Sequence, residues 1–333
     1  MKYLAKIFAL TACTMTIIIS CNDNSSDSPY GEIFRQKPFE AITDSIKKDP
    51  GNDRLLFRRA VLLNTNNFPE PALADFQKAW SIQKEERYAL GISTLLLDKQ
   101  ADSAILFLQE ALKELPRSYL LRLSLARGYT ATSKTKEALA ICDEILSQKP
   151  DLVDVIKLKA DLLDKDNQTA EATILWEKAY QLAPFDVELN YILALRYAEA
   201  KNSRVLSLCD SLIKADTEGR HAEPYYYKGI YYSNLNDKAK ALSAFDEAIK
   251  HDYYFLDGYI EKGSLLYDMK KYEEALAVFN LALTISPSFP DAYYWIAKCQ
   301  EALGKKEEAK VNYLRAYELD KSMKEAKEAA EKL

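Results

Sequence analysis

The chain has 333 residues, of which 48% are hydrophobic and 29% are charged, and it contains only 9 glycines and 11 prolines. Both counts lie below the usual shares of about 7% and 5%, which argues against a turn-rich β fold. The formal net charge of −5 gives no basic surface for nucleic acid or for an acidic membrane, so we expect no nucleic-acid partner.

The first twenty residues have the pattern of a secretory signal peptide. Lys2 and Lys6 precede an apolar run over residues 7–19, which is too short to span a bilayer. The sequence Ile18-Ile19-Ser20-Cys21 resembles the bacterial lipobox, which implies cleavage after residue 20 and fatty acylation of Cys21. We therefore predict a signal peptide over residues 1–20 and lipidation at Cys21.

Two alternatives to this anchor remain open. Leu10-Thr11-Ala12-Cys13 fits the same pattern, but cleavage there leaves an apolar stub, so Cys21 is preferred. The other alternative is an uncleaved membrane anchor. After the cysteine, residues 21–37 lack helical periodicity and contain Ser, Pro and Gly, which predicts a flexible tether. Phe39, Ile42 and Ile46 then share one helical face, which predicts a capping helix or half repeat over residues 38–52.

A regular repeat, with a period of about 34 residues, runs through the rest of the chain. Eight copies of a triplet place a small or aliphatic residue, a bulky or thiol residue four positions later and another small or aliphatic residue three positions further. Offsets of 0, 4 and 7 trace one face of an α-helix. The triplets are Ala72/Phe76/Ala79, Ala104/Leu108/Ala111, Ala138/Cys142/Ile145, Ala172/Trp176/Ala179, Val205/Cys209/Leu212, Ala241/Phe245/Ala248, Ala275/Phe279/Ala282 and Ala309/Tyr313/Ala316. A second helical pattern precedes each triplet, so each unit is predicted to be a helical hairpin.

This pattern resembles the tetratricopeptide repeat, whose signature is W-x₂-L-G-x₂-Y, then A-x₃-F, then P within one repeat. Tyr225-Lys228-Gly229-Tyr232 matches its first part, and the closing proline stands at Pro116, Pro150, Pro184 and Pro287. The resemblance covers residues 53–323, with repeats starting near residues 53, 85, 119, 153, 187, 222, 256 and 290. It implies an all-α fold, a right-handed α-solenoid of about eight helical hairpins, with a C-terminal capping helix over residues 324–333.

Two departures from the period stand out. Residues 216–221 lengthen one connection and include Gly219, which suits a positive φ; they are interpreted as a loop insertion or as a hinge that contacts a partner. Residues 66–71 hold two prolines that fit the first turn of a helix.

The sequence predicts neither an enzyme nor a bound cofactor. Only two histidines occur, without a further ligand at metal spacing, and no catalytic or phosphate-binding glycine motif is present. Asp161, Asp164 and Asp166 faintly resemble a calcium loop but lack its glycine, so a solvated turn is favoured and no metal site is expected. Cys142 and Cys209 take core positions too far apart for a disulfide, and Cys299 is expected to be either buried and inert or a reactive thiol.

In the resembling family, unit positions 2, 5, 6, 9, 12 and 13 of the first helices line a concave groove. Transferred to the four C-terminal units, these positions predict a partner-binding groove of aromatic and aliphatic side chains: Tyr191, Tyr226, Tyr227, Ile230, Ile260, Tyr267, Tyr294 and Trp295. Such a stripe can also be the seam between units. Acids recur at position 2, and Lys157 stands with Asp161 at positions 5 and 9, where some members clamp a terminal carboxylate; Asp161 would repel it.

The resemblance to repeat-containing bacterial lipoproteins implies a membrane-anchored scaffold that binds peptide or helix segments of envelope proteins. We expect an exported protein held by its N-terminal lipid at a bacterial membrane. The outer membrane is favoured, on its periplasmic face or at the cell surface, with a role in envelope assembly or secretion. The alternative function is a glycan-binding surface lipoprotein that stacks sugars on Tyr and Trp.

Overall fold

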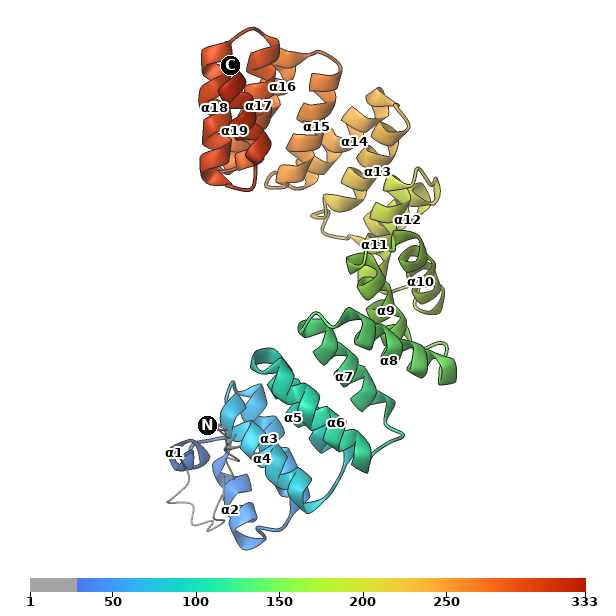
Figure 1. Cartoon of the computed structure of the whole chain (residues 1–333), viewed down its shortest axis with the longest axis vertical. Helices are drawn as coiled ribbons and strands as arrows, with labels where there is room; N and C mark the ends of the chain where they lie inside the picture. The colour runs from blue at the N-terminus through green and yellow to red at the C-terminus, as the bar shows by residue number, and fades with distance from the viewer. Residues whose placement is uncertain (1–28) are drawn as a thin grey trace, which may run out of the picture. The chain divides into compact units, whose positions relative to one another are not determined.

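The computed structural model describes residues 29–333, so the predicted signal peptide and Cys21 lie outside the described residues. Within this range the chain forms nineteen α-helices and no strand (Figure 1), which confirms the predicted all-α repeat fold. The chain divides into two compact units, Met1–Ile141 and Cys142–Leu333, and the boundary falls within α8 (Thr135–Gln148). Each unit is described by itself below.

Unit 1 holds two short helices followed by hairpins of longer helices. The helices are α1 (Gly31–Phe34), α2 (Glu40–Lys48), α3 (Asp53–Thr65), α4 (Pro69–Ile82), α5 (Glu86–Lys99), α6 (Ala101–Glu114) and α7 (Tyr119–Ala131). The two prolines of the 66–71 segment stand in the first turn of α4, as predicted, where a missing N–H costs no helical hydrogen bond.

Unit 2 continues the hairpins to the C-terminus. Its helices are α9 (Val153–Lys165), α10 (Thr169–Leu182), α11 (Val187–Glu199), α12 (Arg204–Ala215), α13 (Glu223–Asn234), α14 (Lys238–His251), α15 (Leu256–Asp268), α16 (Tyr272–Ile285), α17 (Pro290–Ala302), α18 (Lys306–Leu319) and α19 (Lys324–Lys332). Ala326 and Ala330 of α19 are buried and belong to the core cluster that contains Tyr313 of α18.

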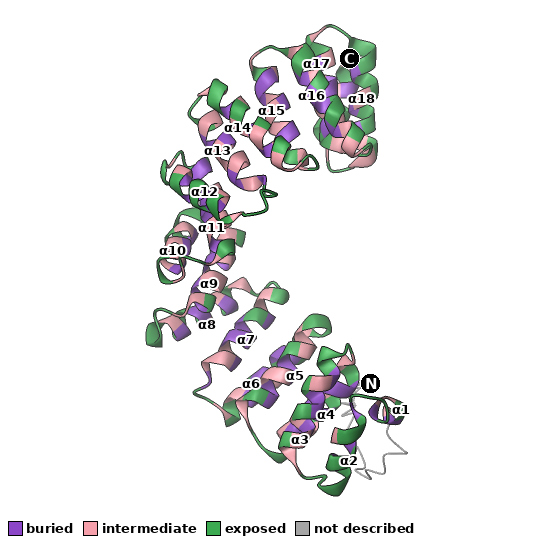
Figure 2. Ribbon diagram, turned by 180° about the vertical axis from the view of Figure 1, so that it is seen from behind, coloured by how far each residue is buried: buried purple, intermediate pink, exposed green. Residues whose placement is uncertain are grey.

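The small-bulky-small triplets form the core of the hairpins. Their residues are buried, and buried positions line the faces that neighbouring helices turn toward one another (Figure 2). The packing is tight where a first helix carries glycine: a Cβ added to Gly263 would lie 2.4 Å from the Phe279 ring, and one added to Gly229 would lie 2.3 Å from Phe245. Each glycine therefore makes room for the phenylalanine of its own hairpin.

The turns inside the hairpins share a left-handed residue. It stands fourteen residues after the predicted repeat start in seven of the eight repeats, and all but one of these residues carry a side chain: Asn67, Ser133, Asn167, Lys201, Asn236, Lys270 and Gly304. The α5–α6 turn differs, because only Gln100 separates the two helices. A left-handed residue ends a helix by turning the chain away, so this position sets the hairpin geometry in the other seven repeats.

The structure corrects the predicted tether at its C-terminal end. Residues 31–34 form α1, and Phe34 is buried at 7% exposure. Its ring lies 3.8 Å from the guanidinium carbon of Arg59 in α3. Tyr30, Ile33 and Phe34 stand at helical spacing, a signal that the tether prediction did not use, and all three pack on the core of the first repeat.

Arg59 belongs to a buried polar group that joins three helices of unit 1. Its Nε and Nη2 donate to the two carboxylate oxygens of Asp75 in α4 at 2.6 and 2.8 Å, and its Nη1 donates to the Thr43 hydroxyl of α2 at 3.2 Å. The side chains of Arg59 and Asp75 are only 8% and 6% exposed. Because both charges are fully paired, this group fixes the position of α2 on the first hairpin.

In unit 2 a recurrent ion pair joins each of three first helices to the second helix of the preceding repeat. The pairs are Lys159–Asp143 at 2.6 Å, Lys228–Asp210 at 2.5 Å and Lys262–Asp246 at 2.5 Å.

The inserted connection 216–221 is held by hydrogen bonds within the loop. The Asp216 carboxylate accepts hydrogen bonds from the backbone N–H groups of Gly219 and His221, and Gly219 has φ +63°. None of the described helices is long and apolar enough to cross a membrane.

Candidate functional site

The eight predicted groove residues lie on the first helices α11, α13, α15 and α17 of unit 2. All eight are partly exposed. Tyr226 and Ile230 pack on one core cluster, Ile260 and Trp295 on the next, and Tyr294 on the last. Tyr267 also packs on the cluster of Ile260, so six of the eight side chains contact the core and also reach the surface, while Tyr191 and Tyr227 contact each other. We call this set of eight residues the aromatic face.

One aromatic cluster joins α11 and α13. The Tyr191 and Tyr227 rings are 6.3 Å apart, the Tyr226 and Tyr227 rings 5.8 Å apart, and the Tyr226 ring meets Phe255 edge-on at 5.2 Å. Burial raises the pKa of Tyr191 and of Tyr227 to about 12, with smaller contributions from nearby carboxylates such as Glu223. These hydroxyls are thus neutral hydrogen-bond donors at physiological pH.

A second cluster joins α15 and α17 and contains its own cation. The Trp295 ring lies 5.6 Å from Tyr267 and 6.1 Å from Tyr294. The Lys298 ammonium lies over all three rings, at 4.3 Å from the Trp295 centroid, 5.1 Å from Tyr267 and 5.7 Å from Tyr294. An ammonium at these distances is attracted by the ring quadrupoles, so Lys298 supplies this cluster with a cation from the chain itself.

Carboxylates line the same helices, and one of them, Glu261, is not among the predicted groove residues. Glu261 stands at unit position 6 of α15, the position of Tyr227 in α13 and Trp295 in α17, so the position rule that selected those residues could have found it. It is half-buried, and burial followed by repulsion from Asp257 raises its pKa. Burial also raises the pKa of Asp291 at the start of α17. Within residues 29–333, no lysine or arginine forms an ion pair with Asp257, Glu261 or Asp291.

The terminal-carboxylate clamp is not available in unit 2. The Lys157 ammonium is 3.1 Å from the Asp186 carboxylate and 2.5 Å from that of Glu188. Asp161 pairs with Lys165 instead. Because two acids already neutralise Lys157, it has no charge to offer an incoming carboxylate.

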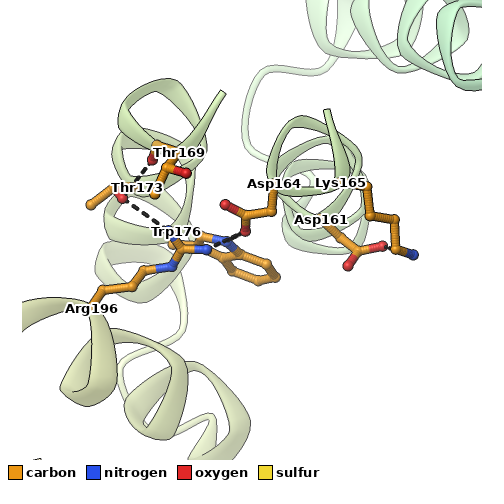
Figure 3. A network of polar contacts seen from close by, with 7 residues as sticks. All are labelled: Asp161, Asp164, Lys165, Thr169, Thr173, Trp176 and Arg196. Atoms are coloured by element: carbon orange, nitrogen blue, oxygen red, sulfur yellow. Dashed lines mark hydrogen bonds and ion pairs between the residues drawn. The ribbon is translucent and has the colours of Figure 1, made fainter. Parts of the chain in front are cut away.

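The acidic residues that faintly resemble a calcium loop are held by other side chains (Figure 3). The Asp164 carboxylate accepts a hydrogen bond from Trp176 Nε1 at 2.8 Å and pairs with Arg196 of α11, which also donates to Thr173 at 3.1 Å. Asp166 accepts from the Gln168 amide. Residues 29–333 contain no group of three or more ligand side chains placed to hold a metal ion. The arrangement ties α9, α10 and α11 together and is a structural network.

The three described cysteines are free and buried. Burial raises the pKa of the Cys142, Cys209 and Cys299 thiols to about 12. Since the thiolate is the reactive form, the structure supports the buried, inert interpretation of Cys299.

Three family models for tetratricopeptide repeats match residues 95–162, 263–304 and 290–323. The chain belongs to the tetratricopeptide repeat family. A solved tetratricopeptide repeat protein from Parabacteroides merdae ATCC 43184 is 19% identical and has a TM-score of 0.59 over 73% of this chain and 96% of that one, which supports the fold. Proteins of this family and fold are typically non-enzymatic, protein-binding scaffolds.

Two curated proteins extend the comparison. Human anaphase-promoting complex subunit 7 is 26% identical over 198 residues, which are 56% of this chain and 33% of the subunit. The match thus spans about a third of that relative's length. An uncharacterised protein of Methanocaldococcus jannaschii is 34% identical over 70 residues, which are 21% of this chain and 81% of that protein.

Proposed function

We propose that this tetratricopeptide repeat protein is a non-enzymatic adaptor of the bacterial cell envelope that binds segments of partner proteins on its aromatic face. The carrying observation is that all eight side chains of this face are partly exposed across four successive first helices, and that six of them also pack on the core clusters. Aromatic side chains give a large contact area with few rotatable bonds, and they are enriched in binding hot spots. An extended or helical segment fits such a row of helices.

In this proposal acylated Cys21 holds the protein at a membrane, with the outer membrane favoured. Its support is the lipobox-like sequence Ile18-Ile19-Ser20-Cys21 after an apolar run. Acyl chains contribute about 0.8 kcal/mol per buried CH₂, so two or three chains anchor a protein stably. A Cys21→Ser variant is expected to leave the membrane fraction on cell fractionation. Its retention there contradicts the anchor, and a Cys13→Ser variant serves as the control.

The binding role is tested by photo-crosslinking in cells from a residue analogue at position 230, followed by identification of the captured proteins. Tyr226→Ala combined with Trp295→Ala is expected to abolish capture while circular dichroism shows unchanged helicity. The matched control is Leu281→Ala with Val311→Ala, which removes exposed apolar side chains from the second helices α16 and α18. Undiminished capture by the Tyr226/Trp295 variant contradicts the binding face.

The glycan alternative finds less support in the geometry. A sugar stacks on an open aromatic face, whereas the Lys298 ammonium lies over the Trp295 ring and the Phe279 ring lies near-parallel to it, 5.8 Å away. A sugar at Trp295 would have to displace the lysine. Quenching of Trp295 fluorescence by soluble polysaccharide, in the absence of any protein partner, would reverse this preference.

A further inference from the structure

The two aromatic clusters of unit 2 differ in charge. The cluster at α15 and α17 takes up the Lys298 ammonium, which lies within 5.7 Å of three ring centroids. The cluster around Tyr226 has comparable walls, with Tyr227 at 5.8 Å and Phe255 at 5.2 Å, and no cation lies over these rings among the described residues. The cluster at α15 and α17 thus holds a cation of the chain itself, whereas the Tyr226 cluster holds none from the described residues.

Two carboxylates next to the Tyr226 cluster have no cationic partner within residues 29–333. Asp257 and Glu261 are one helical turn apart on α15, so their like charges repel each other. Phe255, whose ring lies 5.2 Å from Tyr226, stands directly before α15 and brings the start of this helix to the cluster. Both carboxylates also raise the pKa of the Tyr226 hydroxyl, after the larger effect of burial. Lys262, the residue after Glu261, forms an ion pair with Asp246 on α14 at 2.5 Å.

Such an arrangement favours a cation that comes from outside the chain. A lysine or arginine placed here would relieve the repulsion between the carboxylates and would lie against aromatic rings, as Lys298 does in the neighbouring cluster. Aliphatic neighbours of that cation would meet Ile230, one turn after Tyr226 on α13, and Ile260, directly before Glu261 on α15, both of which are partly exposed. A neutral or acidic guest would leave the two carboxylates unpaired.

We propose that the aromatic face binds a polypeptide segment with a central lysine or arginine, whose cation lies between the Tyr226 ring and the Asp257 and Glu261 carboxylates while flanking apolar residues contact the neighbouring helices. The proposal rests on the proposed binding role of the aromatic face and adds the chemistry of the partner. Lys298 determines where the basic residue of the bound segment lies. Its ammonium disfavours a basic residue beside α17, whereas the carboxylates of α15, one repeat earlier, favour it.

The test uses the purified protein from residue 22 onward and a random-peptide phage library as the probe. Selection on this protein is expected to enrich peptides with one central basic residue between apolar residues. Selection on Asp257→Asn combined with Glu261→Gln is expected to lose the basic residue. The matched control, Glu273→Gln with Glu274→Gln, removes two carboxylates from the exposed start of α16 in the same hairpin and should keep it.

Affinity measurements then determine how much the cation of the peptide contributes to binding. A fluorescein-labelled peptide of the selected sequence is compared with the same peptide carrying citrulline, a neutral analogue of arginine, by fluorescence anisotropy. We expect about tenfold weaker binding of the citrulline peptide to the wild type and less than about twofold to Glu261→Gln, since one charge-assisted contact is worth about a factor of ten.

The outcomes separate the two proposals. Enriched peptides that depend on Tyr226 but carry no basic residue overturn the cation proposal and leave the binding role of the aromatic face intact. A basic residue that survives in the Asp257→Asn/Glu261→Gln selection also overturns the cation proposal. If no enriched peptide depends on Tyr226 or Trp295, both proposals fail.

Discussion

The first hairpin of unit 1 and the α15 hairpin of unit 2 treat charged side chains in opposite ways. In the first, Arg59 and Asp75 satisfy each other and are closed off by Thr43 and Phe34. In the second, Asp257 and Glu261 lie on the surface of the aromatic face with no cation from residues 29–333. The difference teaches that the chain pairs its own charges where helices must be held and leaves them unpaired where a partner is proposed to bind.

The largest effect on stability is expected from removing Arg59, the cation of the buried polar group in unit 1. Arg59→Leu leaves the Asp75 carboxylate buried and unpaired, which is expected to lower the free energy of unfolding by about 3–5 kcal/mol. Urea unfolding, with hydrogen exchange to locate the loss in unit 1, measures this. Arg58→Leu, on the exposed side of α3, is the control. Replacing both partners, Arg59→Met with Asp75→Leu, should recover most of the stability; a single variant that costs under about 1 kcal/mol contradicts the account.

A second change tests the opposite side of α15, where packing is tight. Gly263→Ala places a methyl group 2.4 Å from the Phe279 ring, and such overpacking costs about 1–3 kcal/mol. Thermal unfolding should show this loss although alanine is the better helix former. Gly51→Ala, which has no heavy atom within 4 Å of the added Cβ, is expected to be neutral. Adding Phe279→Leu to Gly263→Ala should restore part of the loss, and equal effects at both glycines would refute the packing argument.

The unpaired carboxylate of α15 predicts a small gain. Glu261→Gln removes the repulsion from Asp257, a like-charge pair one turn apart that costs about 0.2–0.5 kcal/mol, together with the cost of burying the charge. Folding raises the pKa of Glu261 above its ordinary value of 4.5, so the native state binds more protons and the penalty grows as pH rises through that window. The gain should be present at pH 7 and vanish below the ordinary value.

Glu273→Gln on exposed α16 is the control for this pH profile, since it removes the same charge from a solvated position. Its effect on the free energy of unfolding should stay within a few tenths of a kcal/mol. A Glu261→Gln gain that persists unchanged at acidic pH would mean that the carboxylate charge is not its source.

The smallest expected effect concerns the turns that both units share. Lys270 has φ +60°, a conformation that costs a residue with a side chain about 1–2 kcal/mol and glycine nothing. Lys270→Gly is therefore expected to stabilise unit 2 by about 0.5 kcal/mol after the entropy of glycine in the unfolded chain is subtracted. Lys310→Gly, the same replacement within helix α18, should instead destabilise by about 1 kcal/mol.

The regular repeat period was enough to predict the fold, because the small-bulky-small triplets recur at helical spacing and the structure buries them. The helical spacing of Tyr30, Ile33 and Phe34 could have indicated α1, but its packing on Arg59 was not predictable, since that residue lies far along the chain in another helix. At the aromatic face, position within the repeat predicted which rings are partly exposed. The same rule covers Glu261 and Lys298, but their importance depends on ring distances and on absent ion partners that no sequence pattern reports. The binding role of the face stays a prediction.

The α1 segment has a practical consequence for anyone who shortens the chain. A recombinant version that starts at the first repeat, near residue 53, would lack the aromatic lid over Arg59 and the Thr43 hydroxyl that accepts its third hydrogen bond. Water would then reach a charge pair that the intact protein keeps dry. Such a truncation would be misjudged as evidence that the repeats themselves are fragile, whereas the fault would lie in the chosen cloning boundary.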